Sequence, residues 1–210
     1  PINLFGGGLS YKHYDLEAVA IEETLKVLGD LVKEGKIRYV GLSNETPWGL
    51  SEFIKAAEMH DLPKVVSVQN AYNLLNRIYE SGMSEFHHRS QVGLLAYSPL
   101  AQGYLTGKYL DGARPAGART TLFERGQRYE TEQAEEIIRK YVNLANEYSM
   151  DPALMANSFV NDQDFVTSNI IGATTMEQLK IAVGSIDTKL DEECLKKIEE
   201  IHYGCPNPCP

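Results

Sequence analysis

Apolar residues recur every three to four positions in several stretches of the chain, which predicts amphipathic helices. The first stretch covers residues 17–32 and stops at Lys33-Glu34-Gly35, where glycine is a common helix end. Thr46-Pro47 supplies an N-cap and a first-turn proline for a second helix. Further helices are expected at about 79–89, 134–148, 152–159 and 195–201. Thr175 and Gln178 have capping-box spacing and predict one more helix start.

Short apolar runs between the helical stretches predict four β-strands. The runs cover residues 37–42, 65–68 and 94–97 and the surroundings of Ile170-Ile171. Strands that alternate with helices through short connections are parallel and covered by helices, so we expect an α/β fold. Polar or small residues follow the runs, at Ser43-Asn44, Gln69-Asn70, Tyr97-Ser98 and Thr174-Thr175. Such residues converge on one rim in a (β/α)8 barrel, whereas an open sheet would normally carry a glycine-rich GxGxxG turn, which is not present.

Length and composition predict a single domain over residues 1–210, because 210 residues with 43% apolar content can bury one sizeable core. Residues 1–16 are expected to be a loop and residues 204–210 a flexible tail. The three cysteines, Cys194, Cys205 and Cys209, lie near the C-terminal end. Cys205 and Cys209 could bind a metal or form a disulfide, but with no second cysteine pair a reduced, mobile tail without a metal is the favoured interpretation.

The acidic charge balance limits the classes of binding partner that the protein can have. A formal net charge of −9 argues against nucleic acid or an anionic membrane as the main partner. No apolar run approaches the roughly 18 residues of a spanning helix, and no signal peptide opens the sequence. We therefore expect a cytoplasmic protein.

A basic, glycine-containing stretch at residues 92–128 stands out from this acidic background. Its cations are Lys108, Arg114, Arg119, Arg125 and Arg128, against Asp111 and Glu124. Glycines allow backbone N–H groups to approach an anion closely, so the stretch predicts a phosphate-binding loop. The alternative is a solvated, flexible loop whose charges only maintain solubility.

Polar groups at the predicted strand ends suggest a ligand with a planar amide and a flat ring. Ser43, Asn44 and Gln69 offer hydroxyl and carboxamide groups that could hold a planar amide, and Tyr97 could stack on a flat heterocycle. An aromatic ring that carries an amide, with phosphates further along, describes a nicotinamide dinucleotide. Each residue alone is more often a cap or a satisfied strand-end group, so only the set is informative.

Four motifs, GKIRYVGLSNET, VSVQNAYNLL, LLAYSPLAQGYLTGKY and IIGATTMEQL, closely resemble the aldo-keto reductases. The resemblance is to the bacterial Tas-like reductases in particular and, more distantly, to the potassium-channel β-subunits. It runs over essentially the whole chain in the expected order. It implies the C-terminal portion of a (β/α)8 TIM barrel, about strands 5–8 with their helices, which binds NADP(H) and, in the complete barrel, a small-molecule carbonyl substrate.

The resemblance also implies roles for individual residues. Ser43, Asn44 and Gln69 would hold the nicotinamide carboxamide, with Tyr97 stacked beneath the ring. Ser98, Leu100, Lys108 and Arg119 would face the phosphates. Thr174 and Gln178 would lie by the adenosine 2′-phosphate and ribose.

Two departures from the family pattern bear on function. The Asp, Tyr, Lys and His that the family uses for proton transfer come from strands before the point that matches Pro1, so no catalytic residue is assigned here. Where the family usually has Glu-Asn facing adenine, this chain has Ile181-Ala182, which removes polar contacts.

The function therefore has alternatives. One is the cofactor-binding part of an NADPH-dependent reductase of aldehydes or ketones. A second is a non-catalytic NADP(H)-binding or regulatory module that resembles the channel β-subunits, and a third is a remnant that does not fold stably. Four of eight strands cannot close a barrel, and the open edges that remain could support self-association. The alternatives are that the sequence is part of a longer polypeptide, that it associates with another half, or that it rearranges into a different packing. The start in mid-loop without Met favours the longer polypeptide.

Overall fold

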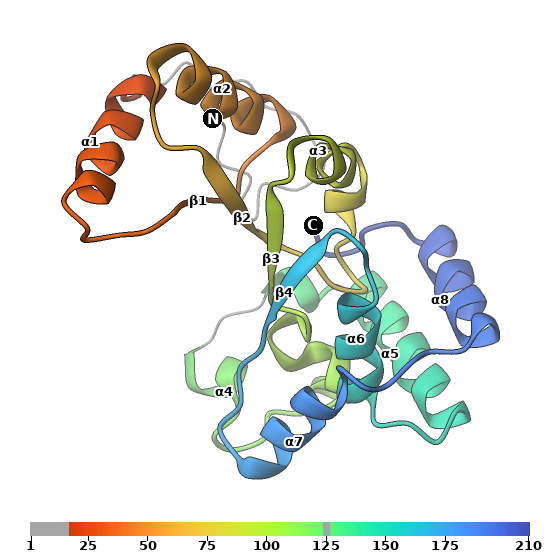
Figure 1. The fold of residues 1–210 in the computed structure, drawn as a ribbon. Coiled ribbons are helices and arrows are strands. Elements are labelled where there is room, and N and C mark those ends of the chain that lie inside the picture. The colour runs from red at the N-terminus through yellow and green to blue at the C-terminus, as the bar shows by residue number, and fades with distance from the viewer. Residues whose placement is uncertain (1–16, 124–126) are drawn as a thin grey trace. The chain divides into compact units, whose positions relative to one another are not determined.

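The computed structural model describes residues 17–123 and 127–210, and the loop expected at 1–16 lies outside these ranges. Strands and helices alternate along the chain as the apolar pattern predicts (Figure 1). The strands are β1 (Val40–Ser43), β2 (Val65–Ala71), β3 (Gly93–Tyr97) and β4 (Val166–Ile170). The helices are α1 (Ile21–Lys33), α2 (Pro47–His60), α3 (Met83–Ser90), α4 (Arg119–Phe123), α5 (Glu132–Glu147), α6 (Pro152–Asn161), α7 (Met176–Gly184) and α8 (Glu192–Gly204).

The strands form one four-stranded sheet in the order β1-β2-β3-β4, with β1 and β2 parallel. Sequential order in a parallel sheet is the arrangement expected when each strand returns through a covering helix. The predicted α/β class is therefore confirmed. β4 begins at Val166, upstream of the apolar pair that marked it in the sequence, and ends at Ile170.

By its contacts the chain divides into two compact units, which we describe separately. Of the described residues, unit 1 comprises 17–70 and 79–95, and unit 2 comprises 71–78, 96–123 and 127–210. In unit 1, α1 packs against α2. Leu25 of α1 and Leu50 of α2 are almost wholly buried. The Thr46 hydroxyl accepts a hydrogen bond from Gly49 N–H at 3.0 Å, which confirms the predicted start of α2.

The core of unit 2 is built around α5 and α6. α5 packs against α6 and α8, and α6 packs against α7 and β4. Tyr72 is fully buried between Phe159 of α6, stacked at 6.1 Å between ring centroids, and the edge of Phe165, at 5.2 Å. Asp151 caps α6 through bonds from Ala153 N–H and Leu154 N–H.

Residues 204–210, which the sequence predicts to be a flexible tail, have packing and hydrogen-bond partners within unit 2. Cys209 is fully buried, and its N–H donates to the Leu75 carbonyl at 3.2 Å. The Asn207 side chain accepts from Arg77 N–H at 2.6 Å. These backbone partners lie more than a hundred residues earlier in the sequence, so local composition gave no sign of them.

Among the described residues, no helix is both long and apolar enough to span a membrane.

Candidate functional site

In unit 1, the ends of β1 and β2 present the three polar side chains expected to hold an amide. Ser43 and Gln69 are register partners in the parallel pair, so their side chains leave the sheet on the same face, and both are exposed. Asn44 N–H donates to the Gln69 carbonyl at 3.0 Å. The Asn44 side chain donates to Ser43 Oγ at 3.3 Å. Unit 1 therefore brings these three residues together at one strand end.

The turn after β1 contains a buried carboxyl group that the sequence interpretation did not single out. Glu45 is only 4% exposed, and its carboxylate accepts from Thr46 N–H at 2.7 Å. Burial raises the pKa of Glu45, and the bond from Thr46 opposes the rise. The Asn70 carboxamide bonds to the Glu45 backbone. Glutamate is usually exposed, so its residue type gave no signal of this position.

Tyr97 closes β3 in unit 2. Its side chain is half-buried, and burial raises the pKa of its phenol while the positive charge of Arg128 opposes the rise. A neutral phenol ring at neutral pH suits the predicted stacking on a heterocycle. Its backbone is fixed, because Tyr97 C=O accepts from Tyr72 N–H at 3.3 Å.

The chain turns sharply after Tyr97. Ser98 has a φ of 58°, in the left-handed region, and its carbonyl accepts from the Asn73 side chain at 2.9 Å and from Ala101 N–H at 2.8 Å. The Leu100 carbonyl accepts from Gly103 N–H at 2.8 Å. The Ser98 and Leu100 carbonyls are thus bonded within the turn, while both side chains are half-buried.

The basic loop carries less uncompensated charge than its sequence suggests. Arg114 pairs with Glu130 at 2.8 Å, and Glu130 also accepts from the Tyr104 hydroxyl at 2.6 Å. Lys108 lies over the Tyr109 ring at 5.2 Å. Arg119, at the first residue of α4, is exposed, and within 17–123 and 127–210 its guanidinium has no partner. Arg125 lies outside the described residues.

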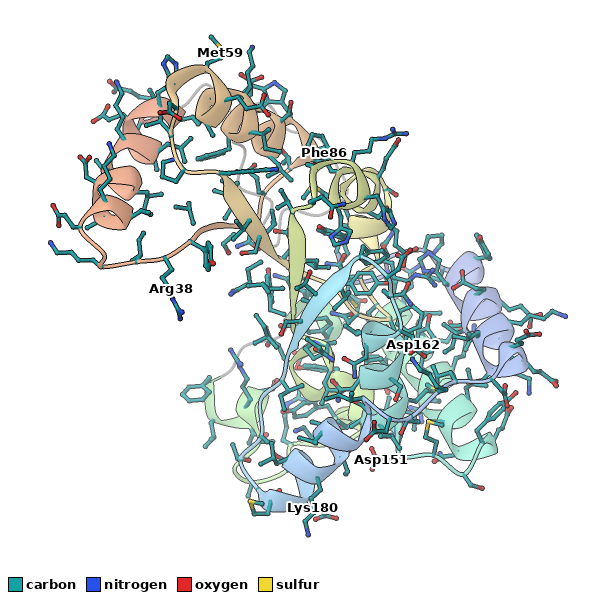
Figure 2. All side chains as sticks on the ribbon, in the orientation of Figure 1. Arg38, Met59, Phe86, Asp151, Asp162 and Lys180 are labelled. Atoms are coloured by element: carbon teal, nitrogen blue, oxygen red, sulfur yellow. The ribbon has the colours of Figure 1, made fainter. Side chains whose placement is uncertain are left out.

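The start of α7 has the predicted cap. The Thr175 hydroxyl accepts from Gln178 N–H at 3.2 Å. Gln178 Oε1 accepts from the N–H and the hydroxyl of Thr174, and both residues are exposed. Further along α7, Ala182 is buried, whereas Lys180 is exposed; Figure 2 shows Lys180 projecting from the helix.

The donor sets suit parts of a nicotinamide dinucleotide. A carboxamide has two N–H donors and a carbonyl acceptor, and Ser43, Asn44 and Gln69 offer both complementary functions at one strand end. Arg119 offers an exposed guanidinium, the group that best matches a phosphate. Ile181 and Ala182, which the sequence resemblance places near adenine, have apolar side chains, and Ala182 is buried.

Comparison with known proteins gives one consistent result. The sequence matches the Aldo/keto reductase family over residues 7–202. It is 47% identical to Protein tas of Escherichia coli over 211 aligned residues, which take in all of this chain and 61% of that protein. It is 38% identical to an aldo-keto reductase of Babesia bovis, over 92% of this chain and 71% of that protein. It is 34% identical to the L-glyceraldehyde 3-phosphate reductase of Escherichia coli, over 84% of this chain and 52% of that protein.

Proposed function

Because the chain belongs to the aldo/keto reductase family, we propose that it is the cofactor-binding part of an NADP(H)-dependent oxidoreductase that reduces aldehydes or ketones. The chain spans 61% of the length of the Escherichia coli protein tas. Its sheet of four parallel strands covered by helices supports the proposal that it forms part of a (β/α)8 barrel.

The observation that carries this proposal is the register pairing of Ser43 with Gln69. In the proposal, these two residues and Asn44 hold the nicotinamide carboxamide, which needs donors and acceptors in one plane. Tyr97 packs its ring against the nicotinamide. The carboxamide contacts and the Tyr97 ring would both act before the chemical step, by orienting the reactive face of the bound nicotinamide.

The remaining assigned residues bind the rest of the cofactor in the proposal. Ser98, Leu100, Lys108 and Arg119 face the phosphates. Thr174 and Gln178, at the capped start of α7, face the 2′-phosphate and ribose, where the positive end of the helix dipole favours negative charge.

NADPH, when bound, supplies the hydride of the reaction. The residues of this chain orient the cofactor and neutralise its phosphates, and neither task needs a titrating side chain. In the proposal, the proton for the carbonyl oxygen comes from the Asp, Tyr, Lys and His set that the sequence resemblance assigns to strands before the point that matches Pro1.

The test is an assay of the full product of the gene with NADPH and a panel of aldehydes and ketones, following the loss of NADPH absorbance. The proposal predicts turnover with at least one carbonyl class, and a large loss of kcat/KM in the Gln69→Ala variant. A folded protein that binds NADPH without turnover would instead indicate a non-catalytic binding module. A folded protein that neither binds nor oxidises NADPH would refute both.

A further inference from the structure

The turn that carries Asn44 is held in place by a side chain from the neighbouring strand. Asn44 has a φ of 52°, in the left-handed region, which costs free energy for any residue with a side chain, although asparagine tolerates it better than most. A conformation of this kind persists only when its surroundings hold it.

The surroundings of Asn44 can be followed bond by bond. Its own N–H donates to the Gln69 carbonyl at 3.0 Å, which continues the pairing of β1 with β2 for one more residue. At Glu45, the residue after Asn44, the backbone bonds to the side chain of Asn70 instead of to the backbone of β2. Asn70 Oδ1 accepts from Glu45 N–H at 3.0 Å, and Asn70 Nδ2 donates to the Glu45 carbonyl at 2.9 Å. The carboxamide thus bonds to both polar backbone groups of Glu45, as a peptide group of a paired strand would.

Gln69 and Asn70 are adjacent in β2, but their side chains have different surroundings. Side chains alternate across a strand, so Gln69 and Asn70 leave β2 on opposite faces. Gln69 is exposed beside Ser43, whereas Asn70 is half-buried and bonded to the backbone of the buried Glu45.

We propose that Asn70 is a positioning residue for nicotinamide binding, which acts by fixing the backbone around Asn44 and so the placement of the Asn44 and Ser43 side chains. This inference rests on the proposed function, because it takes those two side chains as contacts of the nicotinamide carboxamide. Asn70 itself does not touch the cofactor in this account. Its loss leaves Glu45 N–H and C=O without these partners and lets the turn relax.

The experiment compares a complete cofactor with a fragment that lacks the nicotinamide. Calorimetric titration of the full gene product gives Kd values for NADP⁺ and for adenosine 2′,5′-bisphosphate. Asn70→Leu keeps the shape of the side chain and removes both hydrogen bonds. We expect it to raise the Kd of NADP⁺ about tenfold, the effect of losing one or two such bonds. The Kd of the bisphosphate should stay within about twofold, because its assigned contacts lie in unit 2.

A matched control separates positioning from general stability. Thr46→Ala removes the N-cap of α2, only two residues beyond Asn44, and leaves the bonds between Asn70 and Glu45 in place. It should lower Tm, with both Kd values unchanged. If Asn70→Leu changes both Kd values equally, or neither, the positioning role is refuted.

Two further variants distinguish failure of the role of Asn70 from failure of the proposed function. Ser43→Ala and Gln69→Ala should each raise the Kd of NADP⁺ relative to that of the bisphosphate. If they do and Asn70→Leu does not, only the role of Asn70 fails; if none of the three changes the ratio, the proposed function fails as well. If Asn70→Leu does not fold, Asn70→Ala replaces it with the same expected ratio. Failure of both to fold would make Asn70 a folding determinant and refute the inference.

Discussion

Gln178 Oε1 accepts two hydrogen bonds from Thr174, one from the backbone N–H at 2.8 Å and one from the hydroxyl at 3.1 Å. The residues thus form an exposed pair at the start of α7. In a capping box the N3 side chain reaches back to the N-cap N–H, but here it reaches one residue further. The side chain of Gln178 therefore fixes the end of the loop that follows β4.

Replacement of Gln178 by Ala should weaken NADPH binding. The variant releases the Thr174 N–H and hydroxyl and removes one proposed contact, which corresponds to about 1 kcal/mol, or about a fivefold rise in Kd. Because the pair is assigned to the adenosine end, adenosine 2′,5′-bisphosphate should lose affinity by the same factor. A loss confined to the complete cofactor, in calorimetric titrations of both ligands, would contradict this assignment.

If Arg119 meets the 2′-phosphate rather than the phosphates that NADPH and NADH share, its replacement by Ala should weaken NADPH binding far more than NADH binding. An exposed guanidinium without a partner among the described residues is free to meet the 2′-phosphate, and a charge-assisted bond of this kind corresponds to about a tenfold to hundredfold change in Kd. The matched control is Arg114→Ala, whose guanidinium is already paired with Glu130. Fluorescence titration with both cofactors measures the effect. Equal losses for NADPH and NADH would refute a contact between Arg119 and the 2′-phosphate and would indicate the phosphates that both cofactors share.

Replacement of Gly49 by Ala should destabilise the protein although Gly49 lies in α2. A Cβ at this position would lie 2.0 Å from Glu45 Oε1, so the buried carboxylate would have to leave its bond to Thr46 N–H. We expect a loss of about 1–2 kcal/mol in the free energy of unfolding, measured with urea.

Two controls isolate the contact between Gly49 and Glu45. Gly184→Ala, at the end of α7 with open space around its Cβ, should be neutral or slightly stabilising. In a Glu45→Ala background, Gly49→Ala should also cease to destabilise, as a double-mutant cycle would show. An undiminished loss in that background would mean that the clash is not with Glu45.

Thiol labelling should distinguish the packed C-terminal segment from a flexible one. Burial raises the pKa of Cys209 to about 12 and also raises that of Cys194. A raised pKa means that the reactive thiolate is scarce at pH values below it, so at mildly alkaline pH both thiols should react slowly in the native protein. Cys205 is only half-buried and should react first. Mass spectrometry after iodoacetamide treatment would show this order, and equal labelling of Cys205 and Cys209 would indicate a mobile tail.

Local signals in the sequence predicted much of the fold. Thr46-Pro47 and Thr175 each mark a helix start through bonds that span only three residues, and the apolar runs mark all four strands. Contacts between residues distant in sequence were not predictable. Asn70 meets Glu45 across 25 residues, and Arg77 meets Asn207 across 130.

The candidate site shows the same division between local and distant contacts. The place of Ser43 beside Gln69 follows from the register of two predicted strands. The pairing of Arg114 with Glu130 does not follow from any local pattern in the sequence. Composition alone therefore overstates the uncompensated positive charge of the basic loop.

The central claim is that this chain carries a nicotinamide dinucleotide site, and a fluorescence titration of NADPH with the full gene product tests it most directly. Circular dichroism on the same sample would verify that the protein is folded. The account predicts saturable binding, tighter for NADPH than for NADH and weakened in the Gln69→Ala variant. A folded protein that gives no saturable NADPH signal would contradict it.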